Sequence, residues 1–380
     1  MDTANRLTIA FVIDYYRGPN AGTERQLHLM AEGLRRAGIG VRLVVFRHSE
    51  YTASGAFPAP LQVLGVGRVA SPRSWLRVFR WAQKARSEGV SVVHVFFNDP
   101  ALFVPACLAA AGLPCVVARR DMGFWYTPLR LMLLRRMQPF VSRLVANSKA
   151  VAEHCGSAEG YAPEKRTVIP NAVARLDLPS RGPNRGAFTI GLVANIRPIK
   201  RISDAIRALS VLVADDRQIR LRVIGGGDAS ELLALAARLD VADRVEFPGP
   251  TNDVGGALAD FDVALMCSES EGLSNAIMEY MQAGLPVIAT DTGGNAELVT
   301  QDETGFLYPV GDIERLATSL ARIHDTPDLA ASLGAEGARR IREGFSVDRI
   351  VTAYASLYGD IARGNGAPPL KKVEPRQQAD

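Results

Sequence analysis

The sequence predicts an α/β protein of two domains, each built on a parallel, doubly wound sheet with helices on both faces. Short apolar segments alternate with helical segments along the chain, which is the pattern of repeated strand–helix–strand units. The scheme runs twice, and a stretch rich in Pro, Arg, Asn and Gly at residues 171–185 separates the two runs. A chain of 380 residues is long enough to form two such cores.

The expected elements follow this alternation. Strands are expected in the first half at 7–13, 41–46, 92–95, 115–118, 144–147 and 167–170, and in the second half at 188–194, 220–224, 245–247, 263–266 and 287–289. Helices are expected between them, for example at 24–37 and 73–87, and a last helix at 347–362.

These elements divide the chain into five parts. We expect a first domain at 1–173, a linker at 174–187, a second domain at 188–346, a C-terminal helix at 347–363 and a tail at 364–380. The tail has no apolar periodicity and is expected to be disordered.

Composition restricts the class of protein. The longest apolar runs are too short to span a bilayer, and no signal peptide precedes the first expected strand. The four cysteines form no CxxC pair and lie mostly in apolar surroundings, so reduced core thiols and a cytoplasmic location are expected.

Charge is distributed unevenly. Residues 1–180 hold 23 Lys and Arg against 12 Asp and Glu, whereas residues 181–380 hold 21 against 28. A basic first half favours an anionic partner, such as an acidic glycan, a lipid phosphate or the inner face of the plasma membrane. No nucleic-acid-binding module is recognisable, so nucleic acid is not expected as a partner.

Residues 268–294 are the most informative stretch. A buried strand at 263–266 leads into a polar loop, and a helix is expected to begin near Ser274. This layout places the backbone N–H groups of Leu273, Ser274 and Asn275 at a helix N-terminus, where phosphate binds well.

Two glutamates flank that helix N-terminus. Glu271 lies on the loop before it, and Glu279 lies about one turn inside, with a side chain that leans back toward the N-terminus. A carboxylate accepts hydrogen bonds from vicinal hydroxyls and repels phosphate. A diphosphate that carries a sugar on each side therefore fits both the amides and the carboxylates.

This stretch resembles the donor site of the retaining glycosyltransferases of family four, which have the GT-B fold. The residues at matching places are Glu271, Glu279, Ala283, Gly284, Pro286, Val287, Ala289, Gly293 and Gly294. The resemblance implies two Rossmann-like domains that face a cleft, with Glu271 on the transferred sugar and Glu279 on the ribose diol.

Two basic residues follow the first strand of the second domain. Arg197 and Lys200 would project from the end of this strand, where two cations can neutralise a leaving diphosphate. The family also has an Arg and a Lys here. We therefore take Arg197, Lys200 and Glu271 as the catalytic candidates, with no metal and no cofactor besides the nucleotide sugar as co-substrate.

Further donor contacts are expected at glycine-rich turns. Gly225 and Gly227 follow the second strand of the second domain, and Gly22 follows the first strand of the chain, where glycine lets the backbone approach a ligand closely. The resemblance places Phe247 near the nucleotide base.

Some candidates depart from the family pattern. Many members have a His where this chain has Arg120 and Asp121. Together with Arg119, these residues would bind a charged acceptor or the transferred sugar, or Arg120 and Asp121 would simply pair.

Asp260 and Asp262 mimic a metal motif, but they stand before a buried strand and are interpreted as helix-end and strand-start residues.

A basic stripe is expected on the helix at 73–87. Its members are spaced at helical intervals and are Arg73, Arg77, Arg80 and Lys84. Trp81 is expected among them, with Trp75 facing elsewhere. Such a stripe suits an anionic membrane surface, although a solvated face over an ordinary core gives the same pattern.

The sequence thus predicts a metal-independent, retaining hexosyltransferase. It would move a sugar from a nucleotide diphosphate sugar to a glycan or lipid-linked acceptor hydroxyl in bacterial polysaccharide, exopolysaccharide or lipid-linked glycan synthesis. A related GT-B enzyme, such as an epimerase or phosphorylase, and a non-catalytic nucleotide-sugar-binding protein are the alternatives.

Overall fold

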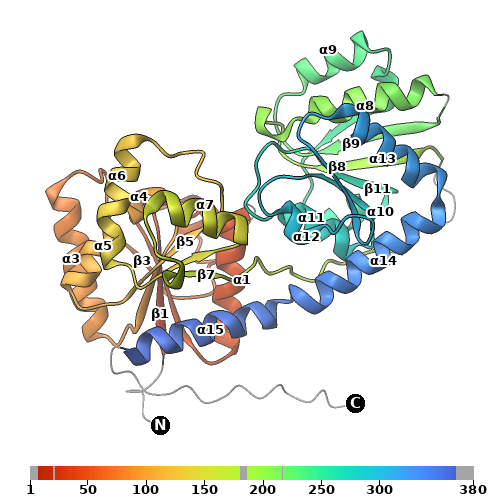
Figure 1. Ribbon diagram of the computed structural model, residues 1–380. Coiled ribbons are helices and arrows are strands. Elements are labelled where there is room, and N and C mark those ends of the chain that lie inside the picture. The colour runs from red at the N-terminus through yellow and green to blue at the C-terminus, as the bar shows by residue number, and fades with distance from the viewer. Residues whose placement is uncertain (1–6, 20–21, 180–185, 216, 365–380) are drawn as a thin grey trace, which may run out of the picture. The chain divides into compact units, whose positions relative to one another are not determined.

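The protein forms two compact units in a computed structural model that describes residues 7–19, 22–179, 186–215 and 217–364. The first unit comprises the chain up to Ala172 and from Val347 onward, and the second comprises Val173–Ser346 (Figure 1). Residues 180–185 of the expected linker and 365–380 of the expected tail lie outside the described residues.

The first unit contains a seven-stranded sheet in the order β3-β2-β1-β4-β5-β6-β7, with every pair parallel. Its strands are β1 (Thr8–Ile13), β2 (Gly40–Val45), β3 (Leu61–Val63), β4 (Val92–Val95), β5 (Cys115–Arg119), β6 (Arg143–Ala146) and β7 (Arg166–Val168). Its α-helices are α1 (Gly22–Arg36), α2 (Glu50–Ala53), α3 (Pro72–Ser87), α4 (Asn98–Ala101), α5 (Val104–Ala110), α6 (Pro128–Met137), α7 (Lys149–Glu159) and α15 (Val347–Gly364).

The second unit contains a six-stranded parallel sheet in the order β10-β9-β8-β11-β12-β13. Its strands are β8 (Phe188–Val193), β9 (Ile219–Ile224), β10 (Val245–Gly249), β11 (Val263–Met266), β12 (Val287–Thr290) and β13 (Gly305–Tyr308). Its α-helices are α8 (Ile202–Ala214), α9 (Ser230–Arg238), α10 (Val254–Ala259), α11 (Asn275–Gln282), α12 (Asn295–Leu298), α13 (Ile313–Asp325) and α14 (Pro327–Gly344).

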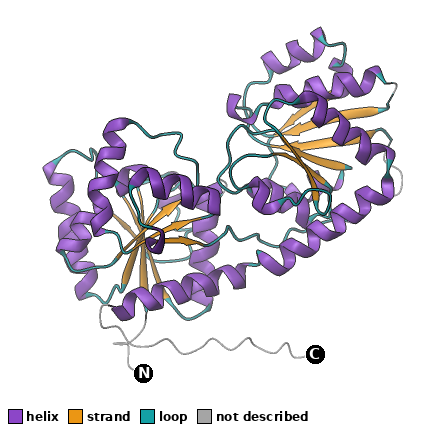
Figure 2. Cartoon of the chain, viewed as in Figure 1, coloured by secondary structure: helices purple, strands orange, loops and turns teal. Residues whose placement is uncertain are grey.

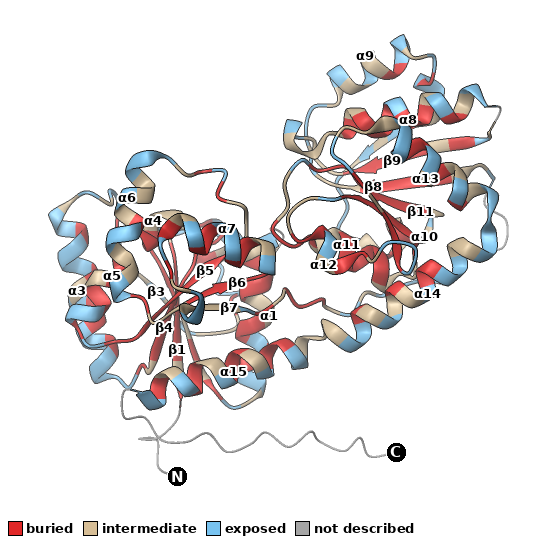
Figure 3. Cartoon of the chain, viewed as in Figure 1, coloured by how far each residue is buried: buried red, intermediate tan, exposed pale blue. Residues whose placement is uncertain are grey.

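Helices cover both faces of each sheet (Figure 2). On β1, Ile9 and Phe11 pack in one apolar cluster with α1 and α15, while Ala10 and Val12 pack in the other with α3 and α5. This alternation is the period of two that a strand buried on both faces requires. The central strands are accordingly buried, whereas the edge strands β3, β7 and β10 are partly exposed, and many other exposed positions lie on the outer faces of the helices (Figure 3). The predicted fold class is confirmed.

The C-terminal helix completes the core of the first unit. Ile350 and Tyr354 of α15 are buried in the same cluster as Leu27 of α1. The two helices approach closely at Gly33, where an added Cβ would lie 2.3 Å from Cγ2 of Val351. The core of this unit is therefore built from both ends of the chain.

Candidate active site

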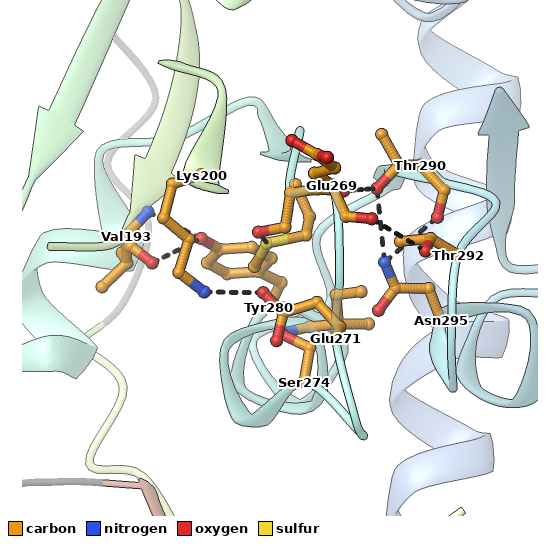
Figure 4. A network of polar contacts seen from close by, with 12 residues as sticks. Val193, Lys200, Glu269, Glu271, Ser274, Tyr280, Thr290, Thr292 and Asn295 are labelled. Carbon is orange, nitrogen blue, oxygen red and sulfur yellow. Dashed lines mark hydrogen bonds and ion pairs between the residues drawn. The ribbon is translucent and has the colours of Figure 1, made fainter. Parts of the chain in front are cut away.

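The candidate residues of the second unit gather at the carboxyl edge of its sheet, where ligands bind in open α/β folds. Strands β8, β11 and β12 are neighbours in the sheet, and the loops that follow them are hydrogen-bonded to one another (Figure 4). Glu269 N donates to Ile199 O at 2.8 Å, and Thr292 Oγ1 donates to Glu269 O at 3.0 Å. These bonds hold the loop that carries Glu271 against both of its neighbours.

Gly293 fixes the position of Glu271. An added Cβ at Gly293 would lie 1.7 Å from the carbonyl oxygen of Glu271, and its φ of +52° is one that other residues rarely adopt. Gly294 N also donates to Glu271 O at 3.4 Å. A side chain at position 293 is therefore excluded, because the backbone of Glu271 lies directly against Gly293.

Lys200 and Glu271 contact each other. Lys200 Nζ lies 2.6 Å from Glu271 Oε1, and both side chains are mostly shielded from solvent. Lys200 is the last residue of a short 3₁₀ turn, Pro198–Lys200, that begins directly after Arg197. Arg197 itself is exposed and forms no ion pair with any residue that the structure describes.

Helix α11 begins as the motif requires. Ser274 is its N-cap, and Ser274 Oγ accepts a hydrogen bond from Ile277 N at 3.3 Å. Leu273 is buried just before the cap, and Asn275 is the first helical residue. Glu279 lies one turn further along and is only 5% exposed. An almost buried carboxylate on this helix can bind hydroxyls without competition from bulk water.

Tyr280 joins α11 to β8, a role that no sequence motif indicates. Val193 N donates to the hydroxyl of Tyr280 at 2.6 Å. Burial raises the pKa of Tyr280, so the phenol stays protonated. Asn295 has a similar role, because its Nδ2 donates to Thr290 O at 3.0 Å. Both side chains hold the backbone of the site in place.

The glycines after β9 lie against the loop that follows β8. An added Cβ at Gly225 would lie 2.0 Å from Ala194 O, and one at Gly227 would lie 2.8 Å from Cβ of Ile196. The missing side chains thus leave room for the loop that carries Arg197. Phe247 lies on β10, half-buried against the core of the unit.

The two aspartates of the apparent metal motif bind separate partners. Asp260 Oδ2 accepts a hydrogen bond from Arg222 Nη1 at 2.6 Å, and Asp262 Oδ2 accepts one from Thr189 N at 2.8 Å. Within the described ranges, no three His, Cys, Asp or Glu side chains are grouped so as to hold a metal ion.

The candidates of the first unit lie at the carboxyl edge of its own sheet. Gly22 is the first residue of α1. Arg119 is buried and forms a bidentate pair with Glu159, at 2.6 and 2.8 Å. Asp121 Oδ1 accepts hydrogen bonds from Gly123 N at 2.8 Å and Trp125 Nε1 at 3.0 Å. Arg120 and Asp121 do not form an ion pair, so the simple pairing considered above does not occur.

The basic stripe lies on the exposed face of α3, but the tryptophan beside it is not the one that the sequence predicts. Trp81 packs in the core and is only 6% exposed, so its expected place in the stripe is wrong. Trp75 and Leu76 are exposed instead, at 37% and 47%.

None of the helices in the described part of the chain has the length and apolar content that a membrane span requires.

Two family matches cover most of the chain. Residues 20–175 match Glycosyltransferase Family 4, and residues 187–326 match the group 1 glycosyl transferases. A solved structure with the same fold is Anabaena Alr3699/HepE in complex with UDP, with a TM-score of 0.80 and 21% identity over 93% of this chain and all of that one.

Two relatives extend the comparison. The N-acetyl-alpha-D-glucosaminyl L-malate synthase of Bacillus anthracis is 30% identical over 45% of this chain. The matched part also spans only 45% of that protein. The D-inositol 3-phosphate glycosyltransferase of Streptomyces scabiei is 30% identical over 86% of this chain and 74% of that protein. With the two family matches, this relative shows that the chain belongs to Glycosyltransferase Family 4.

Proposed function

We propose that this protein transfers a hexosyl unit from a nucleotide diphosphate sugar to an acceptor hydroxyl, with retention of configuration and without a metal ion. The observation that carries the proposal is the Lys200–Glu271 pair beside Gly293, at the edge where β8, β11 and β12 end. It combines a cation for phosphate with a carboxylate for sugar hydroxyls. The HepE structures contain UDP and UDP-glucose, which favours a uridine nucleotide as donor.

In the proposed reaction, the bond between the anomeric carbon and the phosphate oxygen breaks while the acceptor oxygen attacks from the same face. The departing phosphate oxygen takes the proton of the acceptor hydroxyl, so the products are a glycoside and a nucleoside diphosphate. Lys200 and Arg197 stabilise the charge that develops on the leaving phosphate. Glu271 binds hydroxyls of the transferred sugar, and Glu279 binds the ribose diol.

We further propose that the acceptor is a growing glycan or a lipid-linked molecule at an anionic membrane face. Arg73, Arg77, Arg80 and Lys84 lie on the exposed side of α3, with Trp75 and Leu76 beside them. Cationic and apolar side chains that are exposed together suit the headgroup region of a bilayer. The membrane face would belong to the cytoplasm, where nucleotide sugars are supplied to peripheral enzymes.

The test is an assay of nucleotide sugars with candidate acceptors in the presence of EDTA. We expect nucleoside diphosphate release that depends on an acceptor, and an NMR coupling constant in the product that shows the donor's anomeric configuration. Epimerised donor without any acceptor, phosphorolysis of the product, or a requirement for a divalent ion would contradict the proposal. Tight nucleotide binding without turnover would favour a binding protein.

A further inference from the structure

Two adjacent arginines at the end of β5 are in opposite electrostatic situations. Arg119 is 3% exposed, and its charge is balanced by Glu159, which is fully buried. Arg120 is half-buried, and no described residue provides it with a carboxylate partner. A guanidinium that has lost part of its hydration without gaining a counter-charge is costly unless an anion binds to it.

The partners of Arg120 are all neutral. Its Nη1 donates to Asn171 Oδ1 at 2.6 Å, and its Nη2 donates to the hydroxyl of Tyr354 at 3.2 Å. Its Nε is buried without a hydrogen-bond partner, and the guanidinium lies over the ring of Phe96. These contacts orient the guanidinium from three segments of the chain, but they leave its charge uncompensated.

His94 does not compensate the charge either. Burial and the nearby Arg120 hold the pKa of His94 well below its usual value, so the imidazole stays neutral. Its Nδ1 is hydrogen-bonded to the hydroxyl of Tyr358 at 2.6 Å. Burial likewise raises the pKa values of Tyr354 and Tyr358, and both phenols remain uncharged.

Arg120 lines a small pocket. The other lining residues come from the start of α1 and from the ends of β4 and β5, and are Thr23, Phe96, Phe97, Asn98, Ala118, Arg119 and Asp121. Its volume of about 20 Å³ admits one or two water-sized groups and not a sugar ring. The pocket therefore suits the terminal oxygens of an oxyanion.

Asp121 lies in the same lining and defines the ligand further. Its Oδ1 accepts two N–H donors, while no described residue donates to Oδ2. A carboxylate oxygen is an acceptor only, so it would repel an oxyanion but accept a hydrogen bond from a hydroxyl. The two neighbouring side chains thus select a ligand that has both groups.

We propose that Arg120 and Asp121 bind an acceptor that carries an oxyanion, phosphate or carboxylate, close to a hydroxyl, and that Tyr354 of α15 is a positioning residue for Arg120. This inference rests on the proposed function, because it defines the acceptor of that reaction. Its consequence is that neutral polyols are poor acceptors.

The test is calorimetric binding of three probes to the full chain. The probes are sn-glycerol 3-phosphate, D-glycerate and glycerol, each titrated with saturating UDP so that the donor site is occupied. We expect glycerol to bind least, and whichever oxyanion binds more tightly identifies the group. Replacing Arg120 by Gln should weaken oxyanion binding by about tenfold or more, the scale of a charge-assisted hydrogen bond.

Two further variants and one control separate the positioning role of Tyr354 from the hydroxyl-binding role of Asp121. Tyr354→Phe should weaken oxyanion binding while UDP affinity and the melting temperature stay close to wild type. Asp121→Asn should weaken binding of sn-glycerol 3-phosphate relative to inorganic phosphate, whose own binding should be as tight as in wild type or tighter because the repelling charge is gone. The matched control is Arg136→Gln on the exposed side of α6, which should change nothing.

Failure of this inference is distinguishable from failure of the proposed function. If UDP binds but Arg120→Gln binds the oxyanions as wild type does, only the inference is overturned. Equal binding of glycerol and sn-glycerol 3-phosphate to wild type would also overturn the inference and leave the proposed function standing. If neither UDP nor any other nucleoside diphosphate binds, the proposed function fails, whatever the oxyanion probes do.

Discussion

Lys200 Nζ and Glu271 Oε1 are 2.6 Å apart, which brings together a residue from the loop after β8 and one from the loop after β11. Each side chain therefore limits where the other can move. The pair places a positive charge beside a carboxylate, a group that accepts hydrogen bonds from hydroxyls. A donor sugar that binds there would contact both side chains at once.

Replacing Lys200 or Arg197 by Ala should lower turnover by roughly a hundredfold or more, because each removes a preorganised charge from the leaving phosphate. Steady-state kinetics with saturating donor would measure this. Arg238→Ala, on the exposed side of α9, removes the same charge from the same unit and should leave turnover unchanged. Near-normal turnover in both site variants would exclude the leaving-group role.

Replacing Glu279 by Ala should raise the KM for the donor more than it lowers turnover. Ribose is held equally in the ground state and the transition state, so losing its contact removes uniform binding. Kinetics over a range of donor concentrations would test this, with the exposed Glu303→Ala as control. An unchanged donor KM would count against the ribose assignment.

Replacing Gly293 by Ala should destabilise the second unit and inactivate the enzyme. The new Cβ would meet Glu271 O at 1.7 Å, and the backbone would also be strained by roughly 1–3 kcal/mol. Thermal melting and activity would be compared with Gly344→Ala, where an added Cβ meets nothing within 4 Å. Equal melting temperatures for the two variants would contradict the close approach.

Replacing Glu159 by Gln should destabilise the first unit by about 3–5 kcal/mol, because the Arg119 charge would remain buried without its partner. Denaturant unfolding would measure the loss. Glu153→Gln makes the same change on the exposed side of α7 and should have little effect. Similar unfolding free energies for both variants would show that Glu159 does not compensate Arg119.

Binding to vesicles should depend on the basic stripe of α3. Changing Arg73, Arg77, Arg80 and Lys84 together to Gln should abolish most binding to anionic vesicles, since each basic residue contributes about 1 kcal/mol near such a surface. Binding of the wild type should also weaken as salt increases. Co-sedimentation with anionic and neutral vesicles would measure both effects.

The control for this experiment removes the same charge from the second unit. Four exposed arginines there can be changed together to Gln, namely Arg207, Arg238, Arg315 and Arg322. This variant should sediment with anionic vesicles as wild type does. Equal loss in both quadruple variants would mean that net charge, and not the face of α3, determines binding.

The fold class followed from the sequence because buried parallel strands are continuous apolar runs. Strands β3 and β13 were missed for physical reasons. β3 has only three residues at the edge of its sheet, and β13 combines Gly305 with two aromatic residues. Neither forms the β-branched run that identified the central strands.

The sequence predicts where the candidate residues lie in their helices and loops better than it predicts their contacts. The motif placed Ser274 at a helix N-terminus, where the structure also has it. Spacing alone does not show that Gly225 leaves room for Ala194, because that contact depends on how two loops fold over each other. The helical spacing of α3 likewise gave its stripe, but which tryptophan is buried depends on how the helix is rotated against the sheet.

The docking of α15 on α1 at Gly33 has a consequence for synthesis on the ribosome. The buried face of α15 is made last, after all of residues 173–346. At about 5–20 residues per second, that interval lasts roughly 9–35 s. During this time the apolar surface around Phe11 and Leu27 lacks its final cover. The second unit, whose chain is continuous, can therefore close before the first unit is completed.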